Sequence, residues 1–490
     1  MPKTIFNFNM NDSNFTNTVA KTNYRWAICG MLFFATTINY LDRQALSLTW
    51  KDFIAPEFHW TNEHYGMITG LFCLIYAFAM LFFGPIIDFL DTKRGYLCAV
   101  GIWSVGACLH AFCGIATEWW VGAENAADLF HATGMVASAI STISVYFFLM
   151  ARAVLAVGEA GNFPVAIKAI AEYFPRKDRA FATGLFNTGS MVGALAAPFA
   201  IPSIAVRLGW EASFLIIGGL GFIWMALWTF VYKKPAQNNK MNKAELAYIN
   251  QDEENVLQSD ATKKVEKRIP FFKCFTYRQT WSFVLGKFMS DGVWWFFLFW
   301  VPAYLSSVYH MESSSFSSQL AIGVLYLISM LSIVGGYLPT IFVDKFKMEP
   351  YAGRMRAMLI FAFFPLLILL AQPLGRYSYW FPVVIIGIAA AAHQSWSANI
   401  LSTVGDMFPK SAIATVTGIG GMAGGVSSFL INLLSGRFFD YAEIHHLKLF
   451  GFEGIEAGYM VVFSICSVAY LIGWSIMKLL VPEHKLVVLE

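Results

Sequence analysis

Long apolar stretches separated by short polar segments recur along the whole chain. A helix that crosses a hydrocarbon core of about 30 Å needs roughly 20 apolar residues, and this length delimits the stretches. It selects twelve of them, at 24–45, 65–88, 95–116, 144–172, 179–204, 211–232, 279–307, 318–344, 353–373, 377–403, 411–435 and 456–481. The pattern therefore predicts an all-α membrane protein with twelve transmembrane helices.

The distribution of basic residues between the loops predicts the orientation. Most of the 34 Lys and Arg residues lie in the terminal segments, in the central polar tract or in loops on the same side. Loops rich in positive charge stay in the cytoplasm, so we expect both termini on that side of a cell inner membrane. The expected parts are a cytoplasmic tail at 1–23, a first six-helix half at 24–232 with an insert at 117–143, a cytoplasmic central loop at 233–278, a second half at 279–481 and a cytoplasmic tail at 482–490.

Two short motifs recur at a constant offset in the two halves. Phe174-Pro175 and Thr183-Gly184 of the first half match Phe408-Pro409 and Thr417-Gly418 of the second. Two parallel six-helix halves about a central cavity form one known plan for transporters. A chance match of such short motifs is the alternative. The segment 117–143 is too polar for a comfortable span, and it accounts for the extra length of the first half.

The composition supports a lipid environment and excludes several classes of function. Apolar residues make up 57% of the chain and charged residues 13%, whereas soluble domains carry roughly 25% charge. The seven cysteines have no metal-ligand or disulfide-framework spacing. We find no nucleotide motif, catalytic triad or metal cluster, and therefore expect no enzyme activity, no cofactor, no metal site and no nucleic-acid partner. We expect a monomer.

Four ionisable residues lie inside otherwise apolar stretches: Asp42, Arg43, Arg152 and Glu159. Charges at membrane depth are costly, so such residues mark a functional site by default. Arg152 and Glu159 are two helical turns apart and share a face, too far apart to pair within the helix. Each therefore faces a cavity or a partner on another helix. The alternative is a purely structural ion pair, Asp42 with Arg152 or Arg43 with Glu159.

Several motifs resemble those of a known transporter family. The segment from Gly84 through Asp88 to Lys93-Arg94-Gly95 is similar to the loop signature of the major facilitator superfamily. Its members have twelve helices in two halves, and the resemblance assigns Asp88, Lys93 and Arg94 to a cytoplasmic gate. Within that superfamily, the chain resembles the anion:cation symporter family in the segments 38–43, 151–160, 186–187 and 294–302. Its closest resemblance is to the hexuronate transporters, which import glucuronate and galacturonate with protons. The residues that carry this resemblance are 159–164, 168 and 172–175.

Elementary chemistry suggests a division of roles among these residues. The planar fork of Arg43 matches a substrate carboxylate, and Arg152 biases the nearby acids or helps to hold the substrate. Asp42 and Glu159 are the expected proton acceptors, since a nearby arginine and burial act oppositely on a carboxyl group. Further candidates for substrate binding, with packing as the alternative for the aromatic ones, are Tyr40, Lys168, Asn187, Trp295, His393 and Gln394.

A stripe of three residues at helical spacing, Lys287, Asp291 and Trp295, lies in the seventh stretch. An intrahelical ion pair suffices to explain the first two.

The leading hypothesis is a proton-coupled hexuronate importer that works by alternating access. The alternatives are a symporter for another sugar acid (an aldonate or aldarate) or a small organic anion, and an uncoupled organic-anion channel.

Overall fold

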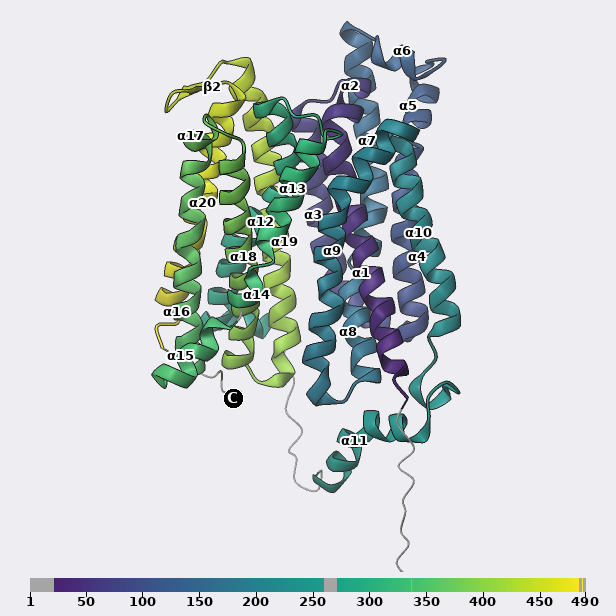
Figure 1. Ribbon diagram of the computed structural model, residues 1–490, viewed down its shortest axis with the longest axis vertical. Helices are drawn as coiled ribbons and strands as arrows, with labels where there is room; N and C mark the ends of the chain where they lie inside the picture. The colour runs from purple at the N-terminus through teal and green to yellow at the C-terminus, as the bar shows by residue number, and fades with distance from the viewer. Residues whose placement is uncertain (1–21, 260–270, 336, 484–486, 488–490) are drawn as a thin grey trace, which may run out of the picture.

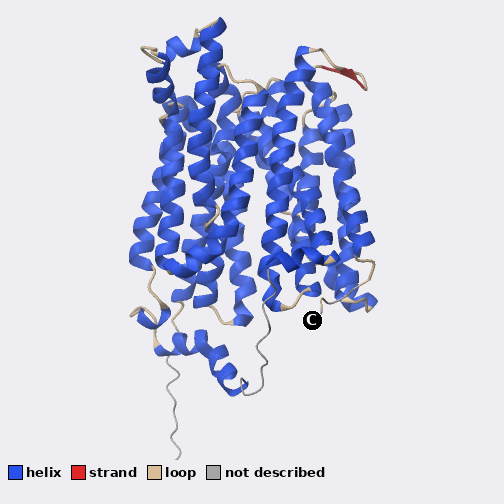
Figure 2. Cartoon of the chain, turned by 180° about the vertical axis from the view of Figure 1, so that it is seen from behind, coloured by secondary structure: helices blue, strands red, loops and turns tan. Residues whose placement is uncertain are grey.

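The computed structural model describes residues 22–259, 271–335, 337–483 and 487. Most of the predicted tails at 1–23 and 482–490, and residues 260–270 of the predicted central loop, lie outside the described residues. The chain forms one elongated bundle of helices, which run nearly parallel to its long axis in Figures 1 and 2.

The helices of the first half occupy one side of the bundle in Figure 1. In chain order they are α1 (Tyr24–Thr49), the π-helical turn η1 (Trp50–Ile54), α2 (Ala55–Phe58), α3 (Asn62–Leu90), α4 (Thr92–Ala111), α5 (Cys113–Val121), α6 (Ala126–Phe130), α7 (Gly134–Glu159), α8 (Asn162–Tyr173), α9 (Arg176–Leu208) and α10 (Trp210–Val231). A connecting segment follows, with η2 (Pro235–Gln237), α11 (Lys243–Ser259) and η4 (Phe271–Thr276).

The second half occupies the other side of the bundle. Its elements are α12 (Arg278–Tyr309), α13 (Phe316–Ser329), α14 (Ser332–Gly335), α15 (Leu338–Phe346), α16 (Pro350–Phe363), η5 (Phe364–Leu370), α17 (Ala371–Gly375), α18 (Trp380–Met407), α19 (Lys410–Ile444), the short antiparallel strands β1 (Lys448–Leu449) and β2 (Phe452–Glu453), and α20 (Ile455–Leu480). We refer to the two ends of the bundle as the α6 end (top in Figure 1) and the α11 end (bottom).

Within the described residues, nine helical segments are long and apolar enough to cross a membrane, and the bent pair α4–α5 makes ten when taken as one span. Helix α1 also runs along the bundle and packs on α9, but Asn39, Asp42 and Arg43 lower its hydropathy. The broken segment α13–α15 is the remaining candidate. The all-α membrane fold is confirmed, and the count of twelve spans stays a prediction.

Some predicted spans differ from the helices in the structure. The predicted fourth span at 144–172 is two helices, because α7 ends at Glu159 and α8 begins at Asn162. Pro164 has no backbone N–H to donate to the carbonyl of Ala160, so an uninterrupted helix would lack that bond. Helix α7 also begins at Gly134, so part of the predicted insert at 117–143 is a helical extension of this span.

The described hydrogen bonds between the two halves lie toward the α6 end. The Asp52 carboxylate accepts from the Ser306 hydroxyl (2.9 Å) and from the backbone N–H of Ser313 (2.6 Å). Asp440 of α19 accepts from the backbone N–H groups of Asn62 (3.0 Å) and Glu63 (2.7 Å) at the start of α3. A carboxylate is favoured at a helix N-terminus, so Asp440 caps α3 from the other half. We call these contacts the α6-end clasp.

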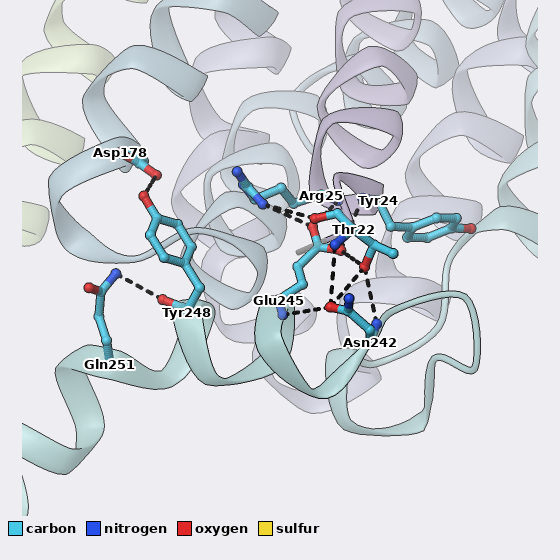
Figure 3. Close-up of polar contacts among 8 residues, drawn as sticks. All are labelled: Thr22, Tyr24, Arg25, Asp178, Asn242, Glu245, Tyr248 and Gln251. Carbon is cyan, nitrogen blue, oxygen red and sulfur yellow. Dashed lines mark hydrogen bonds and ion pairs between the residues drawn. The ribbon is translucent and has the colours of Figure 1, made fainter. Parts of the chain in front are cut away.

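Helix α11 docks on the first half at the opposite end of the bundle (Figure 3). The carboxylate of Glu245, which has no exposed side-chain surface, forms a 3.1 Å ion pair with Arg25. It also accepts from the backbone N–H groups of Tyr24 and Arg25 at 3.1 Å and from the Thr22 hydroxyl at 2.6 Å. Nearby, the Tyr248 hydroxyl donates to Asp178 at 2.7 Å. A residue of the connecting segment therefore satisfies the first N–H groups of α1.

Candidate functional site

A buried ion pair joins α1 to α7 near the middle of the first half. Nε and Nη2 of Arg43 donate to Oε2 of Glu159 at 2.9 and 2.6 Å. The Arg43 side chain is 3% exposed and that of Glu159 is 0% exposed. This is one of the two ion pairs that the sequence allowed, and two guanidinium nitrogens donate to the same carboxylate oxygen.

Close packing of α7 on α4 fixes the position of Glu159. A Cβ added to Gly158 would lie 2.2 Å from the backbone nitrogen of Trp103, so only glycine permits this approach. At the break after Glu159, the Asn162 side chain accepts from the Tyr96 hydroxyl at 2.7 Å and donates to Thr36 at 3.3 Å. The end of α7 is therefore held by both α1 and α4.

Aromatic rings surround the Arg43 guanidinium. Its carbon Cζ lies 5.1 Å from the ring centroid of Tyr40, 4.9 Å from that of Tyr76 and 4.9 Å from that of Trp295. A cation within about 6 Å of such ring faces is stabilised by the ring quadrupole. Trp295 belongs to α12, so the Arg43 site lies where the two halves meet. Tyr40, Tyr76 and Trp295 are each partly exposed.

Arg152 and Asp42 lie beside this pair but do not form the alternative ion pair. Nη2 of Arg152 donates to the backbone carbonyl of Arg43 at 3.0 Å, and its guanidinium lies 4.6 Å from the Phe72 ring. Asp42 is 1% exposed, and among the described residues neither of its carboxylate oxygens has a hydrogen-bond partner. The suggested Asp42–Arg152 pair is thus not observed, and Asp42 is the carboxyl group without a partner at this site.

In the second half, the structure brings His393 into a stacked cluster. Trp294 stacks on the His393 ring with centroids 5.1 Å apart, and Nδ1 of His393 lies 2.7 Å from the hydroxyl of Tyr470. Gln394, the neighbouring candidate, is partly exposed. Lys287 and Asp291 of α12 form a 2.6 Å ion pair one turn from Trp295. The second half therefore carries buried polar side chains of its own on α12 and α18.

Other predicted residues lie away from Arg43. Lys168 of α8 lies close enough to Asp91, in the loop after α3, to stabilise its charge, which places Lys168 toward the α11 end. Asn187 is on the exposed side of α9. The structure thus does not gather these two with the Arg43–Glu159 pair.

The predicted gate residues are only partly described. Nζ of Lys93 donates to the carbonyl of Thr229 at 2.7 Å, which is a contact within the first half. Arg94 is exposed, and the side chain of Asp88 lies outside the description. A gate between the halves at this place stays a prediction.

Two aromatic residues of the site were missed from the sequence. Phe72 and Tyr76 on α3 both contact the Arg43 guanidinium. Their spacing of four residues in an apolar span was the available signal, but many lipid-facing pairs share it. Among the described residues, no group of three His, Cys, Asp or Glu side chains could hold a metal ion.

Comparison with known proteins decides the family. The sequence model of the Major Facilitator Superfamily matches residues 32–432. The chain belongs to this superfamily. It is therefore a multi-pass membrane transporter and not an enzyme, as the resemblance implied.

Several curated relatives are transporters of sugar acids. A hexuronate transporter of Escherichia coli (strain K12) is 25% identical over 461 residues, 93% of this chain and 94% of that protein. A galacturonate transporter of Dickeya chrysanthemi is 26% identical over 330 residues, 67% of this chain and 86% of that protein. Among solved structures, a bacterial homologue of the human lysosomal transporter Spinster, in an inward-facing and occupied conformation, superposes with a TM-score of 0.66 at 18% identity, covering 94% of this chain and 97% of that one. This last likeness supports the fold alone.

Proposed function

We propose that the protein is a proton-coupled symporter that imports hexuronates, such as glucuronate and galacturonate, by alternating access. The observation that carries the proposal is the Arg43–Glu159 pair, buried between α1 and α7 and covered by Trp295 of the other half. The sugar-acid relatives in Escherichia coli and Dickeya chrysanthemi support the choice of substrate.

Exchange of carboxylates on Arg43 would couple substrate to protons. Arg43 already gives two hydrogen bonds to one carboxylate oxygen, and a uronate carboxylate offers the same acceptor. If the substrate takes this place, Glu159 is left as a buried charge without its partner. Such a charge costs several kcal/mol, so Glu159 takes up a proton when the substrate binds. Release of that proton lets Glu159 recover Arg43 and expel the substrate.

Asp42 is the second proton acceptor in this scheme. It lies next to Arg43 in sequence and is buried without a hydrogen-bond partner among the described residues. A buried carboxyl group without a partner is stable only in its neutral form or beside an unsatisfied cation. Arg152, whose Nε and Nη1 also lack described partners, supplies that cation nearby.

The α6-end clasp supports alternating access. Asp52 and Asp440 join the two halves at this end through hydrogen bonds that rocking of the halves would break. With the predicted cytoplasmic loops at the α11 end, the clasp would join the two halves on the external side. We place the protein in the cell inner membrane with both termini in the cytoplasm, on the distribution of Lys and Arg.

Uptake by proteoliposomes tests the proposal. Purified protein is reconstituted, an inward proton gradient is imposed, and entry of radiolabelled glucuronate is followed with unlabelled uronates, aldonates and aldarates as competitors. We expect accumulation that a protonophore abolishes, while exchange of labelled for unlabelled uronate continues. Accumulation that does not depend on the proton gradient would refute proton coupling. Competition by unrelated organic anions as strong as that by uronates would refute the substrate class.

The substitution Arg43→Ala tests the binding role separately. It should abolish uronate binding in a protein that still inserts, because the carboxylate clamp is gone. A binding measurement that finds wild-type affinity in this variant would contradict the proposal. Lys448→Ala is the control, since Lys448 lies in the exposed strand β1 and pairs with Glu453 of the neighbouring strand β2 at 3.3 Å.

A further inference from the structure

The Lys287–Asp291 pair lies on α12, the helix whose Trp295 contacts the first half. Trp295, one helical turn after Asp291, contacts the Arg43 guanidinium at 4.9 Å. Residues 287, 291 and 295 are spaced by four and form one stripe, in which each step is about 6 Å along the helix axis. The stripe also turns by about 40° at each step, so it runs from Trp295 at the Arg43 site toward the interior of the second half, with Asp291 about one turn and Lys287 about two turns from the tryptophan.

The geometry of the pair argues against a merely structural role. Its side chains are 11% and 15% exposed, although they lie in the interior of a helix that spans the membrane. The order of the residues, with Lys on the N-terminal side of Asp, is the weaker arrangement for an i,i+4 pair. Replacing such a pair by apolar residues is often neutral or stabilising, so packing alone gives little reason for it.

The neighbouring helix α19 packs closely on Asp291 at a glycine. A Cβ added to Gly424 of α19 would lie 2.2 Å from Oδ2 of Asp291, the oxygen that binds Lys287. On the other flank, the Tyr470 hydroxyl donates to the backbone carbonyl of Ser290 at 3.3 Å, and the same hydroxyl contacts His393. The pair is thus set between Gly424 of α19 and the polar cluster that Tyr470 of α20 forms with His393 of α18.

We infer that Lys287 and Asp291 form the subsite for the uncharged, hydroxyl-bearing part of the substrate, and that they favour sugar acids with one carboxylate over those with two. The inference rests on the proposed function, because it takes Arg43 as the site of the first carboxylate. One pair offers both a donor and an acceptor to neighbouring hydroxyl groups, and Trp295 offers an apolar face between the two ends.

The charge of the subsite gives the selectivity. Lys287 and Asp291 together are neutral, so they suit the neutral end of a uronate. An aldarate held by Arg43 would bring its second carboxylate to this end, against the Asp291 charge. Juxtaposed like charges disfavour the wrong ligand strongly when they are desolvated, which is a common source of specificity.

Competition in the proteoliposome assay tests this inference. In the wild type, unlabelled glucuronate should inhibit uptake of labelled glucuronate at far lower concentration than galactarate does. In Asp291→Asn the repulsion is gone and Lys287 is free to bind a carboxylate, so the ratio of the two inhibitory concentrations should fall by about tenfold or more. The control is Asp406→Asn, which breaks another ion pair of the second half, with Arg354 at 2.8 Å, and should leave the ratio unchanged.

A parallel loss of affinity for both acids in Asp291→Asn, with an unchanged ratio, would overturn the subsite and leave a structural pair. The double variant Lys287→Gln/Asp291→Asn keeps the test decisive if the single variant fails to insert, because it leaves no unpaired charge. Its ratio should lie between those of the wild type and the single variant, and a wild-type ratio would again overturn the inference. Absence of any sugar-acid uptake by the wild type would instead refute the proposed function, and the inference with it.

Discussion

A double-mutant cycle on Arg43 and Glu159 measures the energy stored in the central pair. Removing one member of a buried ion pair leaves an uncompensated charge and costs about 3–5 kcal/mol. Here that range applies in full, since the two side chains are 3% and 0% exposed and joined by bonds of 2.9 and 2.6 Å. Replacing both members leaves no charge to compensate. We therefore expect Arg43→Gln and Glu159→Gln to be strongly destabilising alone and much less so together.

Close charge pairs couple by about 1.5–7 kcal/mol, so the effects of the two single substitutions should be far from additive. Thermal unfolding of the four detergent-solubilised proteins, followed by tryptophan fluorescence at one scan rate, gives their order of stability. The double variant should melt above both single variants. A double variant that melts below both, by the sum of their effects, would refute the reasoning, because Arg43 and Glu159 would then contribute independently. None of the three variants should accumulate uronate.

Further predictions concern transport, the connecting segment and pH. Glu159→Gln should block accumulation against a gradient yet keep counterflow, and wild-type accumulation would remove Glu159 from the proton path. Glu245→Ala should lower Tm and speed proteolysis of 243–259, because the buried Glu245 carboxylate is the N-terminal cap of α1; unchanged values would contradict that anchoring. Burial raises the pKa of Glu57, in the short helix α2 outside the spans, to about 7 from its ordinary 4.5. The folded state then keeps a proton that the unfolded chain loses, so the free energy of unfolding falls as pH rises from about 4.5 to 7. Glu57→Gln should flatten the fall in Tm between pH 5 and 8, and an equal fall in both proteins would contradict the assignment. Replacing 124–128 by a flexible linker of equal length should leave uptake within about twofold, since these five residues are exposed and exposed segments tolerate such changes; a correctly inserted but inactive protein would show a role for this segment.

Much of the fold could be predicted from the sequence, because a bilayer imposes a fixed length on every apolar helix. What escaped prediction was local backbone geometry within a span. The break between Glu159 and Asn162 depends on Pro164. The length of an apolar stretch does not reveal a helix break of two residues within it. The segment 117–143 was set apart only because it is too polar for a comfortable span, and polarity near a membrane surface does not prevent helices such as α6 and the start of α7 from forming there.

The candidate site was predictable in its residue types but not in its pairings. Helical spacing placed Arg152 and Glu159 on one face, yet two different ion pairs were compatible with that pattern. The observed pair joins residues 116 positions apart, and only the packing of α1 against α7 selects it. The aromatic neighbours Phe72 and Tyr76 come from a third helix whose rotation the sequence does not determine. Long-range contacts of this kind follow from tertiary packing and not from periodicity.

Under the proposed function, the charges around Arg43 give a reason for substrate and proton to move together. The first half contributes Arg43 and Arg152 with Asp42 and Glu159, which sum to zero, and the Lys287–Asp291 pair adds nothing to that sum. A uronate would add one negative charge to a region where net charge is costly. A proton on one of the carboxylates restores neutrality, so the occupied site is most stable when substrate and proton are both present. An open channel would need no such balance, because water would screen the anion along its path. The burial of the Arg43–Glu159 pair therefore favours coupled transport over a channel.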